Sequence, residues 1–363
     1  MRILVVNAGS SSTKLRVIAG EAVVASTDLP AIDVADAGAA AALEAAIAAL
    51  GLVDAVGHRV VHGGMRFRDP TLVDDAVLGE ISALAELAPL HQPRCVAGIR
   101  AARRAIPEAP QIAAFDTAFH ATLPDAAATY ALPAEWRTRW PIRRYGFHGL
   151  SHAWAARRAA GLLSRAATDL RIVSCHLGAG ASLAAVAGGR SVDTTMGFTP
   201  LEGLVMATRS GSVDPGLVLW LQQHGGLDVA DVSDGLEHRG GLVGLARTAD
   251  MRDVIARATQ GEPDAVLALD VYVHRLRASI AAMAASLGGL DALVFTGGVG
   301  EHAPDIRARA VDGLGFLGVA VDSGANADAA PDARIEDTGS APVLVIESRE
   351  DVEIAAQVRA TVA

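Results

Sequence analysis

Apolar runs and amphipathic segments follow one another along the chain and predict alternating strands and helices. Residues 2–7 show too little polar–apolar alternation for a surface strand, so they predict a buried one. Apolar residues recur every three to four positions from Leu269 to Leu287, as on one face of a helix. Further strands are expected at residues 53–62, 111–115, 292–296 and 342–346, and further helices at 34–50, 74–88 and 97–105, from about 304 and from about 351. This alternation predicts an α/β fold.

The first strand opens a strand–turn–strand pattern that the chain repeats in its second half. The first turn consists of the small residues from Ala8 to Ser12, and the second lies within His176-Leu177-Gly178-Ala179-Gly180. Small residues let a backbone bend tightly and bring consecutive N–H groups close to an anion. An ordinary turn explains either copy alone, but the two together predict two related halves that face each other across a phosphate.

Length and composition fit two domains with large cores. The chain has 363 residues, 51% of them hydrophobic, and no apolar run reaches the roughly 20 uncharged residues of a membrane span. Met1 leads directly into the first strand and leaves no room for a signal peptide. The two cysteines, Cys95 and Cys175, are far apart in the sequence and suggest no disulfide framework or metal site. We therefore expect a cytoplasmic protein without a membrane partner.

The charge balance limits which anions the protein can bind. A net charge of −10 argues against nucleic acid as a partner, and it means that a bound anion needs a few placed cations. Lys14 is the only lysine among the 31 cationic side chains, and it follows the first small-residue turn.

Arg59 lies inside an apolar strand that ends at Gly63-Gly64. A buried arginine needs a partner, and this one is either a structural salt bridge or a bidentate clamp on a carboxylate or phosphate. Val61 lies on the same strand face, where it could line a small apolar pocket.

Asp116 directly follows the strand at residues 111–115. Ligands of open α/β sheets bind at the carboxyl ends of the strands, so this carboxylate could hold Mg²⁺ or orient a nucleophile. A turn or helix cap is the alternative. His120 follows four residues later and could support Asp116.

His148 and His152 have the four-residue spacing of a zinc-binding helix. Gly146 and Gly149 interrupt that helix before Ser151, which we expect to be the N-cap, and no acidic residue lies between the histidines. Donation from His148 to a phosphoryl oxygen is therefore favoured over metal binding.

Two glycine-rich segments in the second half could approach phosphates. Arg209 lies in a long loop from Ser191 to Gly216, where it could reach a phosphoryl group in transit, and a solvated surface arginine is the alternative. Residues 296–302 contain three glycines between a strand and a helix and match neither a Walker A loop nor a dinucleotide fingerprint, so an ordinary strand-to-helix turn is the alternative there.

Together these segments resemble the acetate kinase family, which belongs to the superfamily of acetate and sugar kinases, heat-shock ATPases and actin. The resemblance covers nearly the whole chain in family order, at residues 7–12, 57–64, 115–120, 145–152, 176–182, 196–216 and 295–301 and at Glu350. It implies two duplicated actin-like (ribonuclease H-like) domains with a nucleotide cleft between them. The first domain would comprise residues 1–117 plus about 350–363, and the second residues 118–349.

The resemblance also implies a reaction and assigns residues to it. The implied reaction is reversible, direct in-line phosphoryl transfer from ATP to acetate, giving acetyl phosphate and ADP, with Mg²⁺, for which Mn²⁺ can substitute. The catalytic residues would be Asp116, His148 and Arg209; acetate would be bound by Arg59, Val61, Leu90, Phe147 and Pro200; and Mg²⁺ would be placed by Asn7 and Glu350. The nucleotide would be bound by Lys14, His176, Leu177, Gly178, Ala179, Gly180, Asp250, Met251, Arg252, Gly298, Val299, Gly300, Glu301 and His302. The resemblance also implies a homodimer, the usual state in the family.

Two departures from the family pattern and two alternatives remain. Ala179 stands where the family has an asparagine, and the residues around Glu350 are altered. A propionate or butyrate kinase differs only in its methyl pocket, where one methylene changes preference by about 1–3 kcal/mol. A non-kinase ATPase module of the actin type would leave Arg59, His148 and Arg209 without a role.

Overall fold

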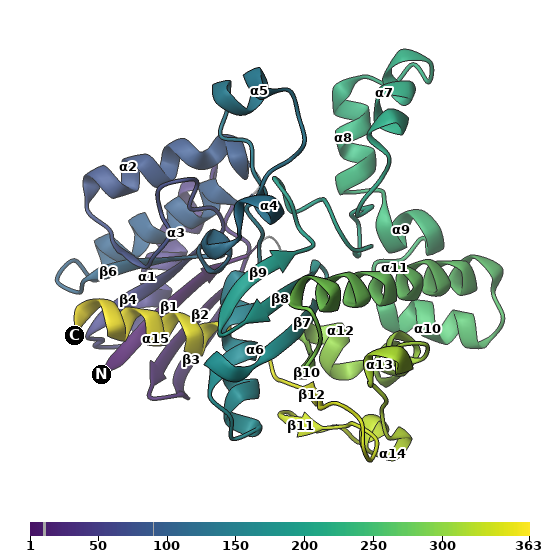
Figure 1. The fold of residues 1–363 in the computed structure, drawn as a ribbon. Helices are drawn as coiled ribbons and strands as arrows, with labels where there is room; N and C mark the ends of the chain where they lie inside the picture. The colour runs from purple at the N-terminus through teal and green to yellow at the C-terminus, as the bar shows by residue number, and fades with distance from the viewer. Residues whose placement is uncertain (10–11, 90) are drawn as a thin grey trace. The chain divides into compact units, whose positions relative to one another are not determined.

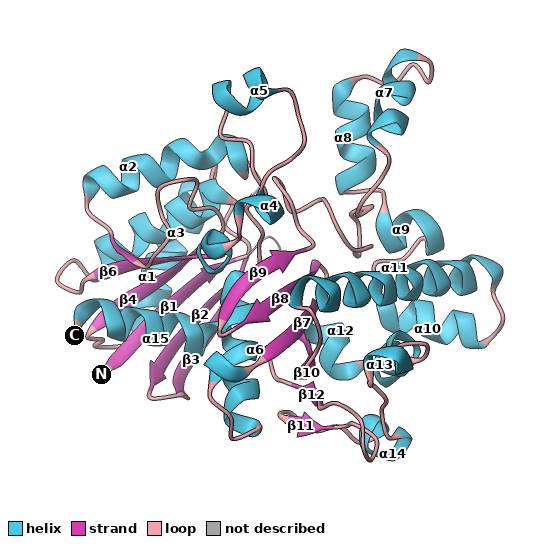
Figure 2. Ribbon diagram, viewed as in Figure 1, coloured by secondary structure: helices cyan, strands magenta, loops and turns pink. Residues whose placement is uncertain are grey.

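Two mixed β-sheets organise the part of the chain that the computed structural model describes, residues 1–9, 12–89 and 91–363 (Figure 1, Figure 2). The chain divides into two compact units, each built around one sheet. The first unit comprises Met1–Ala121, Phe147–Trp154 and Arg349–Ala363, and the second comprises Thr122–Gly146 and Ala155–Ser348. The expected roles of Ser10 and Ser11 in the first turn, and of Leu90 in the methyl pocket, fall outside the described residues.

The first sheet has the strand order β3-β2-β1-β4-β6-β5. Its strands are β1 (Arg2–Ala8), β2 (Ser12–Ala19), β3 (Ala22–Pro30), β4 (Ala55–Val60), β5 (Thr71–Leu72) and β6 (Gln111–Phe115). The first three form an antiparallel meander, whereas β1, β4 and β6 run parallel to one another. The carboxyl ends of these three parallel strands therefore meet at one edge of the sheet.

Helices cover both faces of the first sheet. They are α1 (Ala37–Ala49), α2 (Asp75–Ala83), α3 (Gln92–Ala105) and α15 (Glu350–Val362), and Figure 1 shows α15 returning from the C-terminus to lie along β1. Leu4 and Val6 pack into the core shared with α1 and α3, whereas Ile3 and Val5 pack into the core shared with α15. Successive residues of β1 are thus buried on opposite faces, which confirms the buried strand predicted from its sequence.

The second sheet repeats the topology of the first, in the order β9-β8-β7-β10-β12-β11. Its strands are β7 (Arg171–Leu177), β8 (Ala181–Ala187), β9 (Arg190–Thr194), β10 (Ala292–Thr296), β11 (Ala333–Arg334) and β12 (Val343–Val345). Again the first three form an antiparallel meander, and β7, β10 and β12 are parallel. The strand–turn–strand repeat in the sequence therefore marks two copies of one α/β architecture, as predicted.

The second unit carries more helices than the first. They are α4 (Asp125–Ala128), α5 (Ala134–Arg139), α7 (Pro215–Gln223), α8 (Val229–Glu237), α9 (Gly241–Ala246), α10 (Met251–Thr259), α11 (Pro263–Leu287), α12 (Gly297–His302), α13 (Pro304–Val311) and α14 (Ser323–Ala327). The remaining helix, α6 (Gly149–Leu162), has residues in both units. The apolar face of α11 packs on β7 and β8, which confirms the amphipathic helix predicted there.

Sequence signals placed some element boundaries well and others poorly. The strands predicted at residues 111–115 and 292–296 have those bounds in the structure. The helix expected at 97–105 begins earlier, at Gln92, because Pro93 lies in its first turn, where a missing N–H costs nothing. Throughout the three described ranges, no helix combines the length and the apolar character needed to cross a membrane.

Candidate active site

Arg59 and Asp116 form the centre of a charged cluster in the first unit. Arg59 lies near the end of β4, Asp116 directly follows β6, and the two strands are parallel neighbours, which brings both side chains to one edge. The guanidinium donates from Nη2 to Asp116 Oδ2 at 2.8 Å and from Nε to both carboxylate oxygens at 3.1 and 3.2 Å. Asp116 is only 1% exposed and the Arg59 side chain 18%, so this is a forked ion pair with a buried carboxylate.

Asn7 and Glu350 complete this cluster. Asn7 lies near the end of β1, next to β4, and its Oδ1 accepts a hydrogen bond from Arg59 Nη1 at 3.3 Å. Its Nδ2 donates to Glu350 Oε2 at 3.3 Å, and that oxygen lies 3.7 Å from Arg59 Nη1. Glu350 is the first residue of α15, so the packing of this C-terminal helix on the first sheet places the carboxylate in the cluster.

The electrostatics of the cluster favour a positive ligand. Burial raises the pKa of Asp116 to about 6; the Arg59 guanidinium opposes this rise and the neighbouring Glu350 adds to it. Burial lowers the pKa of Arg59, but the two neighbouring carboxylates raise it by more, so its pKa lies above the usual value. Two carboxylates around one guanidinium leave a negative charge, and carboxylate and amide oxygens are the ligands that Mg²⁺ prefers. These side chains therefore fit a magnesium ion.

His148 is held beside this cluster by a close backbone contact. The Gly149 N–H donates to the Asp116 carbonyl at 2.9 Å, and a Cβ at Gly149 would lie 2.1 Å from that oxygen. His148 itself has a φ of 55°, in the left-handed region that side chains rarely adopt. Its carbonyl accepts from the His152 N–H at 3.0 Å, so α6 begins at Gly149. The prediction of Ser151 as the N-cap is therefore wrong: Gly149, without a side chain, is the residue that fits against Asp116.

Phe147 and Val61 are the two described residues of the expected methyl pocket in the first unit. They are 2% and 7% exposed, and the Phe147 ring meets the ring of His62, the next residue after Val61, at 5.6 Å between centroids. The Phe147 carbonyl lies 3.0 Å from His120 Nε2. Burial lowers the pKa of His120 to about 4, so the neutral ring donates its Nε2–H to this carbonyl. His120 thus supports the loop before His148.

Arg209 lies in the second unit, on a turn that main-chain hydrogen bonds hold in place. Ala207 donates to the Ala179 carbonyl at 3.0 Å, and Ser210 donates to the Leu236 carbonyl at 2.9 Å. The side chain is half-buried, and its Nη1 donates to the carbonyl of Pro200 at 2.6 Å. Burial lowers the pKa of Arg209. A solvated surface arginine, the alternative open from the sequence, is therefore wrong.

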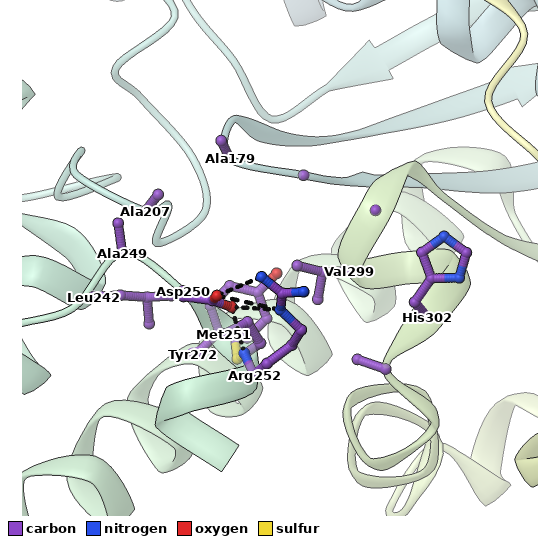
Figure 3. Close-up of a pocket in the computed structure, with 13 residues that line it drawn as sticks. Ala179, Ala207, Leu242, Ala249, Asp250, Met251, Arg252, Tyr272, Val299 and His302 are labelled. Atoms are coloured by element: carbon purple, nitrogen blue, oxygen red, sulfur yellow. Dashed lines mark hydrogen bonds and ion pairs between the residues drawn. The ribbon is translucent and has the colours of Figure 1, made fainter. Parts of the chain in front are cut away.

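A cavity of about 620 Å³ lies in the second unit next to the β7–β8 turn (Figure 3). Eight of the nucleotide candidates line it: Gly178, Ala179, Asp250, Met251, Arg252, Gly298, Val299 and His302. Asp250 caps α10, and its carboxylate accepts from the main chain and from the guanidinium of Arg252, at 2.9 and 2.6 Å. The structure thus brings three separate sequence segments to one cavity.

Other nucleotide candidates have different surroundings. Leu177 is fully buried in β7, Gly180 accepts from the Gly178 N–H at 2.9 Å, and Glu301 Oε1 accepts from the Ser348 N–H at 3.0 Å. Lys14 is exposed on β2 of the first unit, opposite Asn7 in the strand register. His176 and Gly300 lie at the end of β7 and within α12.

Sequence reasoning missed five residues that line the cavity, namely Ala207, Leu242, Ala249, Tyr272 and Ala303. Most of them are apolar, and an apolar residue that lines a ligand cavity has the same sequence signature as a core residue. Ala207 was within reach of a sequence argument, because it lies two residues from Arg209.

Comparisons with known proteins identify the family. The chain matches the acetokinase family over residues 19–356. It is 52% identical over 313 residues to an acetate kinase from Leifsonia xyli subsp. xyli, covering 86% of this chain and 79% of that one. Among solved structures, the acetate kinase of Porphyromonas gingivalis superimposes with a TM-score of 0.91 at 32% identity over 100% of both chains. A propionate kinase from Francisella tularensis superimposes with a TM-score of 0.89 at 35% identity over 98% of both. The chain therefore belongs to the acetokinase family of kinases, whose phosphoryl acceptor is a carboxyl group.

Proposed function

We propose that this kinase transfers the terminal phosphoryl group of ATP to acetate, reversibly and in line, giving acetyl phosphate and ADP. The observation that carries the proposal is the forked Arg59–Asp116 pair at the carboxyl ends of β4 and β6, joined to Asn7 and Glu350. The relatives named acetate kinase support acetate as the acceptor. ATP and acetate are small cytoplasmic metabolites, and the proposal places the reaction in that compartment.

The acceptor determines what the protein must supply. An acetate carboxylate is already ionised at neutral pH and has no proton to lose, so no general base is needed. Asp116 then organises metal or water, while Arg59 and Arg209 bind the carboxylate and the phosphoryl group. His148 donates to a phosphoryl oxygen as charge moves between two anions. Val61, Leu90, Phe147 and Pro200 would enclose the methyl group.

The cavity of the second unit would hold the nucleotide. The main-chain N–H group of Ala179 would face the phosphates, which a turn of small residues permits. Because Ala179 has no side-chain amide, only its main-chain N–H could bind a phosphate there. The small apolar side chains around Met251 and Val299 leave room for a flat ring.

Asn7 and Glu350 would hold Mg²⁺, with Asp116 orienting its bound water. When bound, the ion would neutralise charge on the phosphates during transfer. Across the described ranges, no three His, Cys, Asp or Glu side chains gather as a metal-binding group. That fits an ion that takes its remaining ligands from phosphate oxygens and water.

A hydroxylamine trap tests the reaction and its acceptor. The protein is incubated with ATP, Mg²⁺ and acetate, propionate or butyrate, and any acyl phosphate is captured as its hydroxamate. We expect the highest kcat/KM with acetate, the acceptor in the names of the relatives, and one further methylene should change the preference by about 1–3 kcal/mol. A preference for propionate would favour the second candidate, which the Francisella structure suggests. No hydroxamate from any of the three would refute the proposal.

A homodimer is part of the same proposal. Helix α7 exposes Leu217, Leu219 and Trp220, which are 46%, 55% and 54% exposed, and it has no charged side chain from Pro215 to Gln223. An uncharged apolar surface is complementary to itself, as a two-fold interface requires, so its occupant would be α7 of a second copy.

Light scattering tests this interface. The wild-type protein should have twice the chain mass of 37.2 kDa, and Trp220→Glu should have the single mass, because a buried carboxylate cannot be tolerated there. Gln223→Glu adds the same charge at the exposed end of α7 and should remain dimeric. A wild-type protein of single mass would exclude the dimer.

A further inference from the structure

Arg307 is a buried cation next to one wall of the nucleotide cavity. It lies on α13 and is 1% exposed, the bulkiest of the fully buried side chains among the described residues. Helix α13 directly follows α12 after Ala303, and α12 supplies Gly298, Val299 and His302 to the cavity lining. The guanidinium therefore lies close in the chain to the segment that shapes this wall.

The contacts of Arg307 tie that segment to a neighbouring helix. Its Nη1 donates to the carbonyls of Gly300 and Glu301 in α12, at 2.9 and 2.8 Å. Its Nε and Nη2 donate to Asn326 of α14, to Oδ1 at 2.8 Å and to the main-chain oxygen at 2.6 Å. Asn326 in turn donates from Nδ2 to the Pro304 carbonyl at 2.9 Å. One planar group thus fixes α12, α13 and α14 relative to one another.

None of these acceptors carries a formal charge. All are carbonyl or amide oxygens, and among the described residues Arg307 forms no ion pair with a carboxylate. Burial accordingly lowers the pKa of Arg307. Burying a cation without a counter-ion is costly, and a neutral side chain could fill the same space at lower cost. Stability alone therefore does not explain an arginine at this position.

We infer that Arg307 is a positioning residue of the nucleotide site, because it holds the carbonyl end of α12 and so presets the cavity wall formed by residues 298–302. A wall that is already in place before binding does not have to be ordered by the ligand, which increases affinity. The inference rests on the proposed function, since it takes the cavity to be the place where ATP and ADP bind.

Arg307→Met tests the inference, with Arg309→Met as the matched control. Both arginines lie on α13, but the Arg309 side chain is exposed. Calorimetric titration with ADP and Mg²⁺, without acetate, measures nucleotide affinity apart from catalysis. We expect Arg307→Met to raise the Kd for ADP at least about tenfold, since hydrogen bonds from a charged group are among the stronger ones, and Arg309→Met to leave it unchanged.

Steady-state kinetics separate positioning from a general loss of structure. Arg307→Met should raise the KM for ATP while the KM for acetate stays within about twofold. Arg307→Lys, which keeps the charge and part of the donor set, should fall between wild type and Arg307→Met. If Arg307→Met does not fold, Asn326→Ala removes one acceptor of Arg307 and the hydrogen bond to Pro304, and should still weaken ADP binding severalfold.

Three results would overturn the inference. The first is a folded Arg307→Met with the wild-type Kd for ADP, and the second is an equal rise in the KM values for ATP and acetate. The third, if Arg307→Met does not fold, is a folded Asn326→Ala with the wild-type Kd for ADP. If the wild-type protein binds ADP and the variants bind equally well, only the role of Arg307 fails. If the wild-type protein binds no ADP, the proposed nucleotide site fails and the role of Arg307 fails with it.

Discussion

Gly149→Ala should lower kcat strongly while the protein still folds. The Gly149 N–H donates to the Asp116 carbonyl. This contact joins the first residue of α6, which follows His148, to the residue that follows β6. A methyl group at position 149 would lie 2.1 Å from the Asp116 oxygen and 2.8 Å from Cβ of Phe119. Nothing else about the backbone forbids alanine, because Gly149 does not have a left-handed φ.

The size of the clash sets the size of the effect. A Cβ essentially never lies under 3.0 Å from a non-bonded heavy atom, so Asp116 and the start of α6 have to separate by about 1 Å. A misplacement of about 1 Å in an active site can lower a rate about a hundredfold. The same overpacking should cost about 1–3 kcal/mol of stability. We therefore expect kcat to fall about a hundredfold in a protein that still folds.

The hydroxamate assay measures kcat, and circular dichroism measures the unfolding transition. Gly161→Ala is the matched control, since Gly161 lies on the same helix and an added Cβ would meet no atom within 4 Å. That variant should keep its kcat and gain up to about 1 kcal/mol from better helix propensity. If Gly149→Ala folds and keeps kcat within about threefold of wild type, the Asp116–His148 alignment is not needed for transfer.

Three further changes have outcomes that the structure sets. Arg209→Ala should lower kcat at least about a hundredfold while the protein stays folded, by analogy with the loss of one preorganised oxyanion donor; near-normal kcat would remove this arginine from the mechanism. Burial lowers the pKa of His58 to about 4 from 6.5, so the folded state loses stability as pH falls below 6.5, by about 2 kcal/mol at pH 5. His58→Gln can still donate to Gln111, and it should reduce the difference in unfolding free energy between pH 7 and pH 5 by this amount in urea titrations. An unchanged difference would show that His58 does not cause it. Gly57→Ala should cost about 1–3 kcal/mol in the same titrations, because its Cβ would lie 2.6 Å from Ile354 Cγ2 of α15, and a variant as stable as wild type would show that α15 can move away.

The sequence was sufficient for the duplicated fold because the same local chemistry occurs twice. A buried strand, a turn of small residues and a second strand favour an antiparallel pair, and β1–β2 and β7–β8 are both such pairs. Helix starts were harder to place. Ser151 looked like an N-cap, yet α6 begins at Gly149, since a long-range contact with Asp116 overrides the local capping preference.

The charged part of the site was predictable and the apolar part was not. A buried arginine and a carboxylate at a strand end are costly, so Arg59 and Asp116 attracted attention from the sequence alone. Tyr272 and Leu242 line the cavity beside the β7–β8 turn without any such cost and look like ordinary core residues of α11 and α9. Arg307 was missed for a third reason: its partners are main-chain carbonyls and Asn326, which no spacing rule in the sequence connects.

The two copies of the fold present the same edge with opposite chemistry. In each sheet the carboxyl ends of three parallel strands meet at one edge. In the first unit that edge carries Asn7, Arg59 and Asp116, whose carboxylate and amide oxygens lie around one guanidinium. In the second unit Gly178 follows β7 and Gly297 follows β10, and a cavity of about 620 Å³ opens beside them. The first edge thus carries charged and polar side chains and the second lies beside a cavity, so one topology provides two chemically different edges.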